Sequence, residues 1–145
     1  MPFPKDSEAW LAMSGVTRHP AWTLDPKSIP SEPGVYTWYR DGEPIYAGRA
    51  VAKRGLRGRL AGNHLATGLD LSHSSFRRNV CDHVLGIPTS VTRQRPTVMT
   101  DDQVSVVNDW IRGCEVAWLT FETVDEAKRF ERELLGDWKP PLSKR

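Results

Sequence analysis

The stretch Gly34-Val35-Tyr36-Thr37-Trp38-Tyr39-Arg40-Asp41-Gly42-Glu43-Pro44-Ile45-Tyr46-Ala47-Gly48 decides the fold of this 145-residue chain. Residues 35–39 are β-branched or aromatic, as strands prefer, and Asp41-Gly42 is a strong signal for a tight turn. Ile45-Tyr46 then resumes the strand pattern. The sequence therefore predicts a β-hairpin that carries Tyr36 on its first strand and Tyr46 on its second.

The register of this hairpin decides whether the two tyrosines can act together. A strict two-residue loop at Asp41-Gly42 pairs Tyr36 with Ala47, which places Tyr36 and Tyr46 on opposite faces of the hairpin. A three-residue bulged loop sets them side by side instead. We predict the bulged form.

The bulk properties of the chain indicate one domain of ordinary size, able to bury a core without disulfides or a structural metal. We expect an arm rich in Pro and Trp over residues 1–32, packed through Trp10 and Trp22 on a main domain over residues 33–145. The two cysteines suit a reducing compartment, and no apolar run is long enough to span a bilayer. We therefore expect a cytoplasmic protein without membrane association.

Positive charge is concentrated after the hairpin, although the formal net charge is only +2. No acid interrupts the run from Arg49 to Arg59, which favours a nucleic-acid partner over an ordinary solvated face. The residues predicted to contact nucleic acid are Arg49, Lys53, Arg54, Arg57 and His64. For His64 the candidate roles are a proton donor and a phosphate contact.

The rest of the chain alternates between helix signals and one further strand. Helices are predicted around residues 8–13, over 56–64, after a Ser74-Ser75 cap, and after capping boxes at Thr100 and Thr123. Residues 116–121 have the length and composition of a strand, and 87–99 are predicted as a connecting loop.

Glu131 stands out in the last helix because it falls inside that helix's apolar stripe. Positions advance by ~100° per residue, so Glu133 points away, and only Glu131 turns a carboxylate toward the body of the domain. A buried acid needs a cationic partner, which can be an arginine or a metal ion. A purely structural Glu-Arg pair is the alternative.

These side chains together could hydrolyse a phosphodiester. Glu131 could hold one Mg²⁺, and the planar fork of Arg59 could bridge the scissile phosphate. Tyr46 could orient or deprotonate the attacking water, with Tyr36 assisting from nearby.

The same residues resemble the GIY-YIG endonuclease superfamily. The similarity runs through residues 33–36, 45–48, 56–60 and 130–135 to 139–143. The resemblance implies an α+β fold with a small three-stranded antiparallel sheet flanked by helices. It also implies DNA cleavage that depends on one Mg²⁺ or Mn²⁺ ion, and it assigns the catalytic places to Tyr36, Tyr46, Arg59 and Glu131, with Glu131 as the metal ligand.

Two departures from the family pattern keep alternatives open. Ser143 stands where the family commonly has Asn, and the longer tract before Leu56 makes Arg57 a rival to Arg59 as the arginine that contacts phosphate. A DNA-binding module with impaired catalysis is therefore the second hypothesis, and a protein-interaction domain that uses the Trp-rich arm is the third. A protein partner could supply specificity, whereas the DNA structure preferred, the pathway and the oligomeric state stay open.

Overall fold

The computed structural model describes residues 4–144, so residues 1–3 of the predicted arm and Arg145 lie outside the described residues. The helices are α1 Glu8–Ser14, α2 Gly55–Arg59, α3 Ser75–Leu85, α4 Thr89–Thr92, α5 Asp101–Arg112 and α6 Val124–Asp137. The strands are β1 His19–Pro20, β2 Gly34–Arg40, β3 Glu43–Ala50 and β4 Glu115–Thr120. Short turns of 3₁₀ helix cover Ala21–Thr23, Pro26–Ser28 and Pro141–Lys144, and a π-helical turn, Leu60–His64, continues α2.

The sheet is antiparallel, with the strand order β1-β4-β2-β3. The predicted α+β class and the third strand, β4, are confirmed, but the sheet has four strands and not three. The extra strand β1 pairs His19 with Val116 and Pro20 with Glu115. It escapes sequence patterns because it is only two residues long, and one of them is a proline that an edge strand tolerates.

The hairpin brings the tyrosines to one face by a route that differs from the prediction. The loop is a strict two-residue turn, in which Asp41 and Gly42 have φ values of 52° and 80° and Arg40 pairs with Glu43. The predicted three-residue loop is therefore wrong. The extra residue lies inside β3, because Trp38 pairs with Tyr46 while the next residue of β2 pairs with Pro44, across a bulge. Pro44 has no N–H to donate to the ladder, which suits this irregularity on an edge strand.

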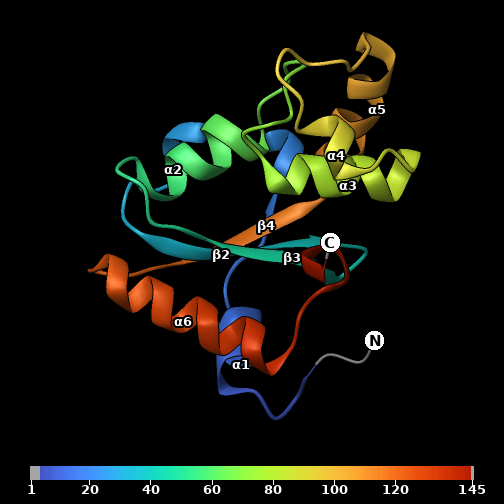
Figure 1. Cartoon of the computed structure of the whole chain (residues 1–145). Helices are drawn as coiled ribbons and strands as arrows, with labels where there is room; N and C mark the ends of the chain where they lie inside the picture. Colours follow the sequence, from blue (N-terminus) through green and yellow to red (C-terminus); the bar gives the residue numbers. More distant parts are fainter. Residues whose placement is uncertain (1–3, 145) are drawn as a thin grey trace.

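Helices cover both faces of the sheet (Figure 1). One face packs its side chains, including those of Tyr36, Trp38 and Tyr46, against α2, α3 and α5. The other face packs Val35 and Ala47 against α1 and α6. The strand β3 lies at one edge of the sheet.

The helix α1, in the predicted arm, packs on the rest of the chain. Trp10 is fully buried and donates its Nε1–H to the carbonyl of Leu134 at 2.9 Å, which ties α1 to α6. Trp22, in contrast, is 72% exposed, so its predicted docking role is wrong. No helix among residues 4–144 combines the length and the apolar character that a membrane crossing needs.

The predicted helix caps are confirmed. Thr100 and Thr123 both form complete capping boxes at the starts of α5 and α6. Ser74 caps α3, and Gly86 ends it in the left-handed region with φ at 70°. The predicted loop over residues 87–99 contains one helical turn, α4.

Candidate active site

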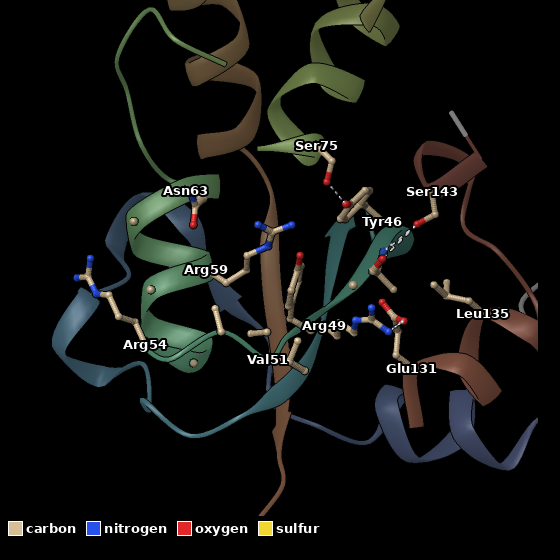
Figure 2. Close-up of a pocket in the computed structure, with 18 of the residues that line it drawn as sticks. Tyr46, Arg49, Val51, Arg54, Arg59, Asn63, Ser75, Glu131, Leu135 and Ser143 are labelled. Atoms are coloured by element: carbon tan, nitrogen blue, oxygen red, sulfur yellow. Dashed lines mark hydrogen bonds and ion pairs between the residues drawn. The ribbon is translucent and has the colours of Figure 1, made fainter. Parts of the chain in front are cut away.

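A cleft of about 870 Å³ runs along the edge strand β3 (Figure 2). Its walls come from β3 and the segment that follows it, from α2 and its π-helical turn, from α3, and from α6. The predicted site residues that line the cleft are Tyr36, Tyr46, Arg49, Lys53, Arg54, Arg59 and Glu131. The structure therefore brings together, in one open groove, side chains that are far apart in the sequence, such as Tyr36 and Glu131.

Glu131 enters the cleft from α6, on the side that the helical pattern predicts. Its side chain is only 18% exposed, and Oε1 lies 3.5 Å from Nη1 of Arg49 on β3. Burial raises the pKa of the Glu131 carboxyl, and the nearby Arg49 guanidinium partly opposes this shift. Among the cleft residues that the structure describes, Glu131 is the only acid.

Arg59 enters from the opposite side of the sheet. It lies at the end of α2, and Leu56 of α2 and Leu60 of the π-helical turn are buried in the same core cluster as Tyr36. Its Nε is buried and has no hydrogen-bond partner within residues 4–144. Arg59 lines the cleft, and a planar guanidinium in a concave site is suited to bind an anion.

Arg57 has a different position. It does not line the cleft; its Nε donates to the carbonyl of Ile29 at 2.8 Å, and its Nη2 donates to the carbonyl of Lys27 at 3.3 Å. These bonds hold the Pro26–Ser28 turn and the chain after it against α2. The geometry therefore favours Arg59 as the cleft arginine and gives Arg57 a structural role.

The two tyrosines lie side by side, with ring centroids 6.4 Å apart. The Tyr46 hydroxyl shares a 2.5 Å hydrogen bond with Ser75 Oγ on α3. Tyr36 pairs with Gly48 across the hairpin, and a side chain at position 48 would lie 2.6 Å from the Tyr36 hydroxyl. Burial raises the pKa of both phenols above the ordinary value, and the Arg59 guanidinium acts in the opposite direction.

His64 is placed behind Tyr36 and not at the surface. The side chain is fully buried, with Nε2 2.6 Å from the Tyr36 hydroxyl and Nδ1 2.6 Å from Ser74 Oγ. Burial lowers the pKa of the imidazole well below its usual value, and the arginines at positions 59, 77 and 78 lower it further. The imidazole is therefore neutral at pH 7, and its burial argues against the direct phosphate contact predicted from the sequence.

Lys53 and Arg54 occupy the open end of the cleft. Both side chains are exposed, and neither forms an ion pair with another residue of the described chain. With Arg49 and Arg59 they give the cleft lining four cations against the single carboxylate of Glu131. Such an excess of positive charge in a concave site attracts an anionic ligand.

Ser143 closes the cleft beside β3. Its Oγ accepts a hydrogen bond from the Ala47 N–H at 3.0 Å and donates to the Ala47 carbonyl at 3.4 Å. Nearby, Asn79 Nδ2 donates to the carbonyl of Leu142 at 2.9 Å, which fixes the same C-terminal turn to α3. Ser143 thus fixes the C-terminal turn to β3 through both backbone groups of Ala47.

Three polar residues of the site were not singled out as site residues from the sequence: Ser74, Ser75 and Asn79. The only signal available for them was the Ser-Ser pair, which predicted a helix cap. Ser74 does cap α3, since its Oγ accepts the N–H of Arg77 at 3.0 Å, but the same oxygen also contacts His64. A local pattern cannot reveal this second contact.

The donor set around Glu131 decides which metal ions fit. Among residues 4–144, no three His, Cys, Asp or Glu side chains lie close enough together to share an ion. A single carboxylate fits Mg²⁺ or Mn²⁺, because Mg²⁺ in proteins keeps several waters and takes its other ligands from substrate phosphate. It does not fit zinc, which takes three or four protein ligands.

A comparison with protein families agrees with this geometry. The family model described as GIY-YIG catalytic domain matches residues 21–145, and the chain therefore belongs to this family, whose domains are nuclease domains. No curated protein and no solved structure matches the chain.

Proposed function

We propose that this protein is a metal-dependent endonuclease that hydrolyses DNA phosphodiester bonds by direct attack of a water molecule. One observation carries the proposal. Arg59 and Glu131 come from helices on opposite faces of the sheet, yet both reach the cleft at the edge of β3 where Tyr36 and Tyr46 lie. An arginine fork, a carboxylate and two phenols around one anion-binding groove are the groups that phosphodiester hydrolysis requires.

Arg59 is assigned to the scissile phosphate. Its planar guanidinium can donate two parallel hydrogen bonds to phosphoryl oxygens and stabilises the negative charge that grows on them. Lys53 and Arg54, at the open end of the cleft, are assigned to flanking phosphates. Arg49 holds Glu131 in place through their 3.5 Å contact and is the third flanking cation.

Tyr46 is assigned to the attacking water. When its hydroxyl donates to Ser75, the phenol oxygen keeps lone pairs that can accept a hydrogen bond from a water in the cleft. A phenol is protonated at pH 7 already at its ordinary pKa, and burial raises the pKa of Tyr46 further, so Tyr46 orients the water. It can take the water's proton only when positive charge in the loaded site lowers its pKa.

Tyr36 is assigned an assisting role that depends on His64. The imidazole fixes the Tyr36 hydroxyl through one nitrogen and is itself fixed by Ser74 through the other. The phenol is therefore held in one rotamer beside Tyr46. We assign His64 as a positioning residue in place of a phosphate contact.

Glu131 would hold the single Mg²⁺ or Mn²⁺ ion, which when bound supplies a Lewis acid that stabilises the leaving oxygen and the phosphoryl charge. Only the ionised carboxylate binds a cation, and the carboxyl pKa of Glu131 is raised, so activity should fall as the pH drops toward that pKa.

The setting of the activity is also part of the proposal. Cys81 and Cys114 are both buried free thiols, which agrees with a reducing compartment, and we propose a cytoplasmic location. The cleft contacts are to phosphate and carry no base information, so a protein partner or the shape of the DNA is left to supply specificity.

The test is a nicking assay on supercoiled plasmid with Mg²⁺, comparing the wild type with Glu131→Gln. Glu133→Gln is the matched control, because Glu133 is exposed on the same helix and does not line the cleft. We expect the wild type and the control to nick DNA and Glu131→Gln to lose at least about 100-fold in rate while keeping the wild-type circular dichroism spectrum.

Two results would contradict the proposal in different ways. Equal nicking by Glu131→Gln and the wild type would remove the assigned role of the carboxylate. Salt-sensitive DNA binding without cleavage in either Mg²⁺ or Mn²⁺ would identify a DNA-binding module with impaired catalysis.

A further inference from the structure

A second group of arginines lies beside the cleft without lining it. We call Arg78, Arg93 and Arg95 the α3–α4 basic surface: Arg78 lies on α3, Arg93 directly follows α4, and Arg95 lies in the segment after it. Helices α3 and α4 contact each other in the helical layer that also holds α2 and α5 (Figure 1). Arg93 and Arg95 are exposed, and Arg78 is half-buried.

Two of the three guanidinium groups bond to Ser72, whereas Arg93 bonds to Thr89. Arg78 Nη1 donates to the carbonyl of Ser72 at 2.5 Å, and Arg95 Nε donates to the hydroxyl of the same serine at 2.8 Å. Burial lowers the pKa of Arg78, and the positive charge of Arg93 lowers it further, with smaller effects from Arg59 and Arg95. The charges of Arg93, Arg59 and Arg95 therefore all act on Arg78.

The first two turns of α3 connect this surface to the active site. Ser75 contacts the Tyr46 hydroxyl, and Asn79 lines the cleft one turn later. Arg78 follows Ser75 by three residues, a spacing that places side chains on the same side of a helix, about 5–6 Å apart. A strand of DNA that leaves the cleft past Ser75 therefore reaches Arg78 first and the exposed arginines next.

One nearby acid, Asp70, interacts electrostatically with Arg95, but among the described residues it pairs with no arginine of this surface. None of the three forms an ion pair with any residue from 4 to 144. Asp70 lies in the same region, but its carboxylate contacts His73 Nε2 at 3.6 Å and accepts the N–H of Ser72 at 2.8 Å. Backbone and hydroxyl oxygens hold the guanidinium groups in place, and donors not used in these bonds stay available for an anion.

We propose that the α3–α4 basic surface binds the sugar-phosphate backbone of the DNA that flanks the scissile phosphate. The inference rests on the proposed nuclease function and extends the substrate contact beyond the cleft. Arg93 and Arg95 contact successive phosphates, and Arg78 joins them to the cleft. A stretch of several nucleotides on one side of the cut is thereby held in register before cleavage.

The experiment measures binding of a short fluorescent duplex in EDTA, across a series of salt concentrations. Arg93→Ala/Arg95→Ala is compared with Arg112→Ala/Arg129→Ala, which removes two exposed arginines outside the cleft and outside this surface. Because each phosphate contact contributes about 0.9 to the slope of log Kd against log salt, the first variant should lose about 1.8 from that slope. The second should keep the wild-type slope.

A further variant separates charge from structure. Arg93 also bonds the carbonyl of Thr89, so its loss can disturb α4. Arg93→Lys/Arg95→Lys keeps the charge and should keep most of the slope. If the alanine variant binds DNA with the same slope as the Arg112/Arg129 control while the wild type cleaves DNA, the surface proposal is overturned and the nuclease survives. Absence of DNA binding by the wild type overturns both.

Discussion

Gly48→Ala should displace the Tyr36 hydroxyl from its place in the active site. Gly48 pairs directly with Tyr36 across the hairpin, and a Cβ at position 48 would lie 2.6 Å from the hydroxyl oxygen and 3.0 Å from the carbon that carries it. The ring has little freedom to avoid the new atom, because Tyr36 is 1% exposed and stands among the rings of Trp38, Tyr46 and His64.

The size of the effect follows from these distances. Ordinary van der Waals contact begins at 3.4 Å, so the oxygen must move away by about 0.8 Å. The same oxygen makes the 2.6 Å hydrogen bond to His64 Nε2, and both partners are buried. Weakening a buried bond of this kind costs about 1–3 kcal/mol of folding stability. A displacement near 1 Å at a catalytic group costs roughly 100-fold in rate.

The assay combines urea denaturation with the rate of plasmid nicking. Gly136→Ala is the matched control, because Gly136 lies in α6 outside the cleft and an added Cβ there meets nothing within 4 Å. It should gain about 0.5–1 kcal/mol of stability from helix propensity and keep wild-type activity. If Gly48→Ala nicks DNA as fast as Gly136→Ala does, the positioning role of Tyr36 is refuted.

Three further predictions concern single side chains. The pKa of Glu131 is raised in the fold, so the folded state holds more protons than the unfolded state between the ordinary and the raised value, and stability falls as pH rises through that window. Glu131→Gln should remove this decline in thermal melts at pH 4 to 8. A parallel pH dependence in both proteins would contradict the prediction. Ser143→Ala should lose about 1 kcal/mol in urea titrations, because the N–H of Ala47 loses its acceptor, and no loss would mean that water replaces the hydroxyl. Trp10→Ala should lose about 3–5 kcal/mol and Trp22→Ala less than about 0.5, and similar losses would contradict the observed burial.

The sequence predicted the elements of the site better than their contacts. Capping boxes and helical periodicity depend on neighbouring residues, so they predicted where α6 begins and that Glu131 faces the body of the domain. The bulge at Ile45 could not be placed, because it depends on pairing with β2 and not on the turn alone. His64 was predicted to contact nucleic acid, because no local pattern shows that its buried ring bonds to Ser74, ten residues away.

The position of β3 at the sheet edge explains how one cleft can collect groups from both layers. A central strand has a neighbour on each side, and side chains from the two faces cannot meet around it. At an edge strand, side chains from the two faces can meet beyond the free side of the strand. The absence of a side chain at Gly48 leaves room there for the Tyr36 hydroxyl. Edge strands also risk pairing with other chains, and here Ser143 occupies both backbone groups of Ala47. The contact that steadies the site therefore also keeps its edge closed to an added strand, which would otherwise cover the cleft between Arg59 and Glu131.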